Sequence, residues 1–124
     1  MFDWRRPDNL GVSNGRLAPC RRTPNCVSSQ ADPSDAEHYI APLEGTMEAV
    51  RKAVESLPRA TIVSQRQNYL YAEFRSKLLG FVDDVEFFHD GSVIQVRSAS
   101  RLGRRDFAVN RRRIERLRAM ITQL

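Results

Sequence analysis

The chain has 124 residues, which fits one domain, and its 41% hydrophobic and 28% charged residues are ordinary for a globular protein. It has no apolar run of about 18 residues, so the sequence offers no helix that would span a membrane. The net charge is +5, and nine Arg with two acidic residues fall between positions 97 and 118. This basic region suits an anionic partner.

The first 36 residues are rich in Pro, Gly, Asn and Ser and show little periodicity, which predicts an irregular N-terminal arm before a domain at 37–124. They also lack the apolar stretch of a secretory signal, which predicts a cytoplasmic protein. A short edge strand is predicted at 38–42. A helix follows at 46–57, where Met47, Val50, Val54 and Leu57 share one face, and Pro58 ends it.

Four strands are predicted next, at 59–66, 68–76, 81–89 and 92–100. In the second, Leu70, Ala72 and Phe74 take one face. The other face carries Tyr69 and Tyr71, which mark either a partner surface or a second core layer, followed by Glu73 and Arg75.

The last helix is predicted at 107–123 with Asp106 as its N-cap. Its core stripe consists of Phe107, Ile114, Leu117, Ile121 and Leu124. The elements predict an α+β fold, an antiparallel meander of four to five strands with two helices on one face, in the order β-α-β-β-β-β-α.

The strongest turn signal is Asp90-Gly91, which predicts a two-residue hairpin loop. That register pairs Phe87 with Ile94 and Val85 with Val96 on the apolar face. It then places Asp83 opposite Ser98 on this face and Asp84 opposite Arg97 on the other.

Asp83 continues an apolar stripe, and Asn110 lies at the centre of the last helix's apolar face, so both need buried partners. We expect Asp83, Ser98, Ser100 and Asn110 to converge, with arginines around them: Arg97, Arg101, Arg104 and Arg111. Two interpretations remain open. The cluster is either a buried polar staple or an anion pocket built by Ser98, Ser100, Arg101 and the helix N-terminus.

Cys20 and Cys26 fit neither zinc nor redox spacing. An oxidising compartment would allow a disulfide between them, whereas a cytosol would keep both as thiols. His38 and His89 show no ligand spacing, so we expect no metal site and no cofactor.

Three runs and one further motif resemble domain of unknown function family 1499. The runs are Pro24 to Gln30, Phe81 to Glu86 and Arg97 to Gly103, and the motif is Asp106 followed by Val109-Asn110-Arg111. The resemblance covers nearly the whole chain from about residue 15. It implies a bacterial family with plant relatives, no established activity and no catalytic residues to transfer. It also implies that some members are exported or membrane-tethered, which would suit a Cys20–Cys26 disulfide.

The favoured function is a non-enzymatic binding module for a small anionic ligand or an acidic protein partner. The candidate ligand-binding residues are Asp83, Arg97, Ser98, Ser100, Arg101, Asn110 and Arg111. In this interpretation, replacing Arg101 with Ala abolishes binding with little loss of stability.

One alternative is a small enzyme that uses Asp83, although adjacent strand residues such as Asp83 and Asp84 point to opposite faces. The other is nucleic-acid binding through the basic helix, which lacks interleaved aromatic residues. The arginines concerned are Arg111, Arg112, Arg113, Arg116 and Arg118.

Overall fold

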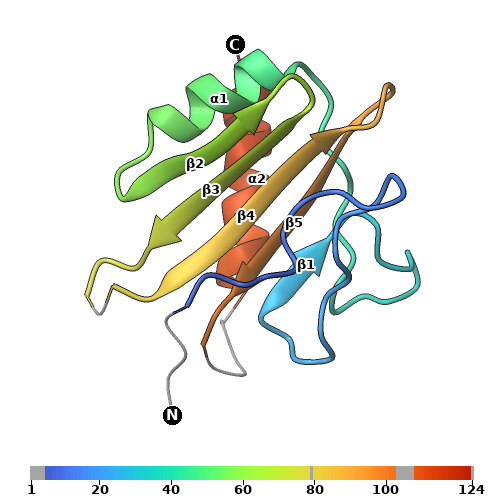
Figure 1. Cartoon of the computed structure of the whole chain (residues 1–124), viewed down its shortest axis with the longest axis vertical. Coiled ribbons are helices and arrows are strands. Elements are labelled where there is room, and N and C mark those ends of the chain that lie inside the picture. The colour runs from blue at the N-terminus through green and yellow to red at the C-terminus, as the bar shows by residue number, and fades with distance from the viewer. Residues whose placement is uncertain (1–4, 79, 103–107, 124) are drawn as a thin grey trace.

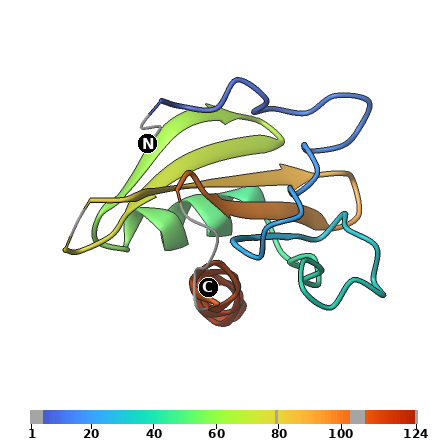
Figure 2. The ribbon, with the colours of Figure 1, turned by 90° about the horizontal axis from the view of Figure 1, so that it is seen from below.

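A computed structural model describes residues 5–78, 80–102 and 108–123 of the protein. The elements are β1 (Cys26–Ser28), α1 (Met47–Glu55), β2 (Ala60–Arg66), β3 (Tyr69–Arg75), β4 (Val82–His89), β5 (Ile94–Ser100) and α2 (Val109–Thr122). The strands form one antiparallel sheet in the order β1-β5-β4-β3-β2. Both helices cover one face, and the N-terminal segment crosses the other (Figures 1 and 2). The α+β fold and its element order are as predicted.

Helix α1 begins where the hydroxyl of Thr46 accepts a 3.1 Å hydrogen bond from the amide of Ala49, a standard N-cap contact. Its buried residues, Val50, Ala53 and Val54, recur at helical spacing and face the sheet.

The buried residues of α2 are Asn110, Ile114, Leu117 and Ile121. This helix begins at Val109, two residues later than predicted, after Ala108 in a left-handed conformation with φ 63°. The predicted cap Asp106 and the predicted core residues Phe107 and Leu124 lie outside the described residues, as does Arg104.

The first strand of the sheet is not where the sequence predicted it. The expected edge strand at 38–42 is wrong, since this stretch makes only an isolated bridge between Tyr39 and Ser28. The edge strand is β1, which lies within the predicted irregular arm and pairs with β5. Its three residues are too few to show the alternation by which strands are recognised.

The β4–β5 register also differs from the prediction, by two residues. His89 pairs with Ile94, so the loop has four residues, and Val85 faces Ser98 rather than Val96. The carboxylate of Asp90 explains the wider loop, because its Oδ1 accepts from the amides of Ser92 and Val93. A shift of two keeps every side chain on its predicted face.

The core lies between the sheet and the two helices. It joins residues of every strand except β2 to both helices, and Phe87, Leu70, Ile114 and Leu117 are among its largest fully buried side chains. None of the helices in the described part of the chain is long and apolar enough to cross a membrane.

Candidate functional site

The sheet face opposite the helices, here called the outer face, carries a polar network. Because side chains alternate between faces, Tyr71, Glu86 and Arg97 form one row across β3, β4 and β5. Glu73 and Asp84 form the adjacent row on β3 and β4. All five side chains are buried, and buried polar groups need hydrogen-bond partners.

Arg101, one residue beyond β5, ties the carboxylates together. Its Nε and Nη2 donate to the two carboxylate oxygens of Asp84, each at 2.9 Å, and Nη2 also donates to Oε2 of Glu73 at 2.6 Å. The hydroxyl of Tyr71 lies 2.5 Å from Asp84 Oδ1 and 2.8 Å from Glu73 Oε2. Such bidentate, charge-assisted contacts are the strong ones, so Arg101 is committed to the protein's own carboxylates.

The N-terminal segment closes over this network. Arg6 Nε donates to Glu73 Oε2 at 2.7 Å. The backbone amide of Gly11 and the hydroxyl of Tyr69 both donate to Glu86 Oε2, at 2.7 and 2.5 Å. The burial of the outer face therefore depends on a segment far away in sequence.

These contacts determine the protonation states of Glu73 and Tyr71. Hydrogen bonds from Arg6, Tyr71 and Arg101 lower the pKa of Glu73 to about 2. Burial raises the pKa of Tyr71, and its hydrogen bond to Asp84 raises it further. Near neutral pH Glu73 is therefore charged and Tyr71 neutral, and neither is poised for proton transfer.

Arg97 differs from Arg101 because no carboxylate of a described residue is hydrogen-bonded to its guanidinium. Its one hydrogen bond to a described residue runs from Nη2 to the carbonyl of Pro19 at 3.4 Å, and its buried Nε has no partner. Oε1 of Glu86, the opposite residue on β4, is also buried without a partner. Burial lowers the pKa of Arg97 and raises the pKa of Glu86, so both charged forms are poorly compensated.

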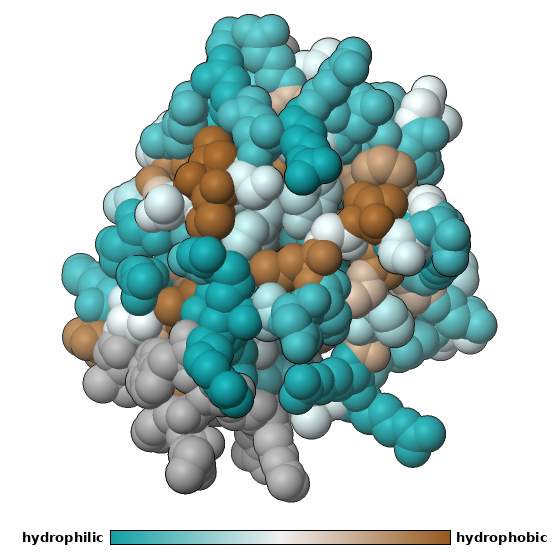
Figure 3. Space-filling model, viewed as in Figure 1, coloured by the Kyte–Doolittle hydropathy of each residue, from teal (hydrophilic) through white to brown (hydrophobic). Residues whose placement is uncertain are grey.

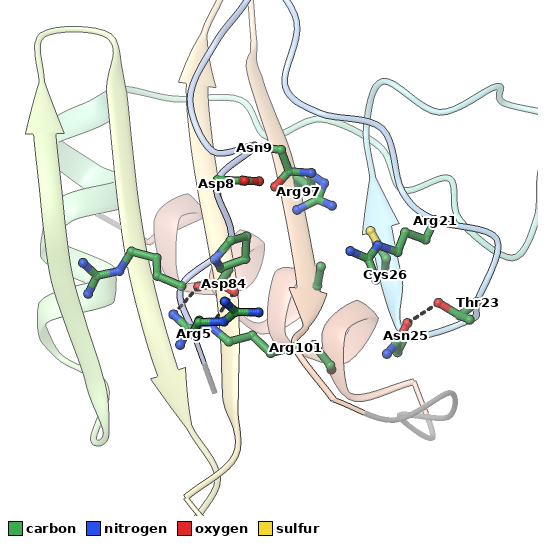
Figure 4. Close-up of a pocket in the computed structure, with 14 residues that line it drawn as sticks. Arg5, Asp8, Asn9, Arg21, Thr23, Asn25, Cys26, Asp84, Arg97 and Arg101 are labelled. Atoms are coloured by element: carbon green, nitrogen blue, oxygen red, sulfur yellow. Dashed lines mark hydrogen bonds and ion pairs between the residues drawn. The ribbon is translucent and has the colours of Figure 1, made fainter. Parts of the chain in front are cut away.

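A cavity of about 690 Å³ opens beside Arg97, between the N-terminal segment and the loop that precedes β1 (Figure 4). Five arginines line it: Arg5, Arg6, Arg21, Arg97 and Arg101. The acidic side chains among its lining residues are Asp8 and Asp84, and the latter is bonded to Arg101. Exposed Arg21 makes no ion pair with a described residue and lies close enough to lower the pKa of Arg97. The cavity thus holds two neighbouring guanidinium groups, those of Arg21 and Arg97, to which no carboxylate of a described residue is bonded.

A second polar cluster lies on the helix face. Ser98 Oγ donates to Asn110 Oδ1 at 2.5 Å, and Asn110 Nδ2 donates to Ser100 Oγ at 3.0 Å. Arg113, which the sequence placed among the arginines of the nucleic-acid alternative and not in this cluster, donates to Asn110 Oδ1 at 2.8 Å and to Asp83 Oδ2 at 2.7 Å. Ser98 and Asn110 are fully buried, so this cluster ties α2 to the sheet.

The predicted site residues therefore separate into two groups. Asp83, Ser98, Ser100 and Asn110 come together on the helix face, where Arg113 neutralises Asp83. Arg97 and Arg101 lie on the outer face and do not surround that cluster. Arg111 belongs to neither group and donates to the backbone carbonyls of Ala36 and Glu37.

Sequence reasoning placed the carboxylates and tyrosines of the outer face on this side of the sheet but did not predict that they form a buried network. Tyr69, Tyr71 and Glu73 alternate along β3, and Asp84 and Glu86 do so along β4. Two neighbouring strands with polar residues on the same face were the available signal. This alternation does not predict that the residues are buried. They are covered by the N-terminal segment through Arg6 and Gly11, and the sequence of that segment shows no periodicity.

Cys20 and Cys26 form a disulfide beside the cavity, which Cys26 helps to line. Both ring nitrogens of His38 have partners, since Nδ1 lies 2.8 Å from Asp35 Oδ2 and Nε2 lies 2.9 Å from the Thr23 carbonyl. Within the described residues, no three or more His, Cys, Asp or Glu side chains group as metal ligands would.

The sequence runs that resemble the family contain Asn25, Asp84, Ser98 and Asn110. In the structure these runs form β1, β4, β5 and the start of α2, at the centre of the fold. A family model described as "Protein of unknown function (DUF1499)" matches residues 16–121, which is most of the chain. The chain belongs to this family. No curated protein matches the sequence. The family match begins after Arg6 and Gly11, so the segment that covers the outer face lies outside it.

Proposed function

We propose that the protein binds a small anion in the arginine-lined cavity of the outer face. The observation that carries the proposal is Arg97, whose buried guanidinium has an unpartnered Nε and no carboxylate ligand among the described residues. A buried charge without a partner is costly to a fold. A carboxylate or phosphate beside Arg97 would supply the missing compensation.

The surroundings of Arg97 support an anion rather than a cation. Arg21 is the neighbouring guanidinium, and Thr23 and Asn25 add a hydroxyl and an amide group to the lining. Guanidinium forks bind carboxylate and phosphate oxygens in pairs, and a cavity of several hundred Å³ fits a small molecule. Ser100 and Arg101, both predicted binding residues, also line this cavity. Arg101 adds positive charge to the cavity, although its guanidinium N–H groups donate hydrogen bonds to Asp84 and Glu73.

The test measures the melting temperature of the protein, and by titration calorimetry its affinity, with inorganic phosphate, acetate, citrate and nucleotides. A ligand at a hundredfold excess over its Kd adds about 2.7 kcal/mol of stability. We expect a stabilising anion whose affinity falls by about one to two orders of magnitude in Arg97→Gln or Arg21→Gln. Arg66→Gln is the matched control, because Arg66 is exposed, makes no ion pair with a described residue and does not line this cavity.

A second variant separates ligand binding from a structural role. Arg97→Met removes a buried charge that has no hydrogen-bonded carboxylate among the described residues, so the ligand-free protein should lose little stability, while anion binding is lost. A large loss of stability in Arg97→Met would show that Arg97 is structural. Unchanged melting with every anion tested would also overturn the proposal.

A further inference from the structure

The opposite side of the molecule carries a second basic surface, separate from the outer-face cavity. A hollow of about 240 Å³ lies between the end of β3, the residues before β2 and the first turns of α2. Arg59, Arg75, Arg112 and Arg116 line it, and Leu57 and Phe74 contribute apolar surface. All four arginines are exposed. We call this surface the basic hollow.

Three of these arginines form no ion pair with the described part of the protein. Arg59, Arg75 and Arg116 make no ion pair with any residue that the structure describes. Other arginines of α2 behave differently: Arg113 is bonded to Asp83, and Arg118 to Glu115. The positive charge of these three arginines is therefore not neutralised by the part of the protein that the structure describes.

An exposed apolar residue follows Arg75 by three positions in the chain. Leu78, in the turn between β3 and β4, is 90% exposed and is the most exposed large hydrophobic side chain of the described chain. The base of the turn is fixed, because the Ser76 amide donates to the Phe81 carbonyl at 2.8 Å and the Phe81 amide donates to Ser76 Oγ at 2.9 Å. This turn extends past α1 at the end of the sheet where α2 begins (Figures 1 and 2). Exposed Lys77 adds a further cation without an ion pair to a described residue.

We propose that the basic hollow and Leu78 form a docking surface for an anionic lipid bilayer. Unpaired arginines attract lipid phosphates, and an aliphatic side chain on a fixed turn enters the boundary between headgroups and acyl chains. Leu78 favours lipid over nucleic acid, because single strands are bound by stacking on aromatic side chains. Binding of double-stranded nucleic acid by the arginines of α2 is also disfavoured. Of these arginines, Arg111, Arg113 and Arg118 already make contacts within the protein.

The test is sedimentation of the full chain with vesicles of phosphatidylcholine alone, and with vesicles in which about a third of the lipid is phosphatidylglycerol. Excess inorganic phosphate is kept in solution throughout to saturate the outer-face cavity. We expect sedimentation with the anionic vesicles alone, weakened by added salt. Each of Arg75→Gln and Arg116→Gln should reduce the partition coefficient about fivefold. Leu78→Ser should reduce it about tenfold.

Two exposed residues at other places in the fold provide matched controls. Arg66→Gln removes an exposed arginine without an ion pair to a described residue, and Val63→Ser removes a 38% exposed apolar side chain. Both should leave the partition coefficient unchanged. Equal sedimentation with neutral vesicles, no sedimentation at all, or full binding by Leu78→Ser would overturn the proposal. Release from the vesicles by a short oligonucleotide that itself binds would assign the surface to nucleic acid instead.

Discussion

Arg97 and Arg101 are four residues apart and face the same side of the sheet, yet their environments differ. Arg101 contacts two carboxylates, and its hydrogen bonds with Asp84 raise its pKa. Arg97 is buried, but its guanidinium makes only a long contact to a carbonyl among the described residues, and burial lowers its pKa. The same residue type thus completes a structural network at one position and makes no bond to a described carboxylate at the other.

The Arg101 contacts predict a loss of stability in Arg101→Ala, contrary to the sequence-based expectation of a small effect. Removing Arg101 leaves Asp84 and Glu73 buried beside each other without their shared cation. Breaking a buried ion pair in this way typically costs about 3–5 kcal/mol. Urea unfolding at neutral pH should show this loss. A change below about 1 kcal/mol, typical of exposed pairs, would contradict it.

The loss in Arg101→Ala should also depend on pH. The pKa of Glu73 is lowered from 4.5 to about 2 in the folded protein, so its ionised form stabilises the fold above pH 4.5. That contribution disappears as the pH falls from 4.5 toward 2. The free energy of unfolding of the wild type should therefore fall over this pH range. The difference in this free energy between the wild type and Arg101→Ala should become smaller.

At the scale of elements, α2 is attached to the sheet by a polar contact inside an apolar interface. Asn110 lies one turn before Ile114 and is fully buried. Its amide donates to the backbone carbonyl of Asn25, next to β1, and to the Ser100 hydroxyl on β5. One side chain thus fixes the helix relative to two neighbouring strands.

We therefore expect Asn110→Ala to lower the free energy of unfolding by about 2–4 kcal/mol, because it leaves several buried groups without partners. The double variant with Ser98→Ala should cost less than the sum of the two single changes, since Ser98 donates to Asn110. Urea unfolding of the four proteins in this cycle measures the coupling. Strict additivity would show that the contact between Ser98 and Asn110 contributes nothing.

The strands of the meander were predictable from the sequence, and β3 most clearly, because its apolar and polar residues alternate. Leu70, Ala72 and Phe74 were assigned to the core face, and all three are buried there. The hairpin register was not predictable from Asp90-Gly91 alone. Hydrogen bonds from Ser92 and Val93 to the Asp90 side chain stabilise a longer loop, and a shift of two residues leaves the apolar pattern unchanged.

The site was predictable only in part, for the same physical reason. Asn110 and Asp83 were found because polar residues interrupt apolar stripes at those positions. Glu73 and Glu86 occupy a strand face that would normally be solvated. Only contacts with residues more than 60 positions away, at Arg6 and Gly11, show that this face is covered. Local patterns contain no information about such contacts.

The whole molecule has two covered sheet faces of different character. The helices cover one face with apolar side chains, whereas the N-terminal segment covers the other through Arg6 and the Gly11 amide (Figure 2). The outer surface on that side is mostly hydrophilic, with scattered apolar patches (Figure 3). Among the described residues, every member of the hydrophobic core cluster lies between Val27 and Ile121, so the described part of the cover contributes no residue to this cluster.

Removing residues 1–15 should therefore uncover the outer face without destroying the fold. We expect cooperative thermal unfolding at a melting temperature several degrees lower, with Tyr69 and Tyr71 newly accessible to chemical modification. Burial now raises the pKa of Glu86, so this pKa should fall toward its ordinary value, as carboxyl NMR would show. Arg6→Gln in the full chain is the control, because it breaks one ion pair and keeps the cover. Loss of cooperative unfolding in the shortened chain would instead make the segment part of the folding unit.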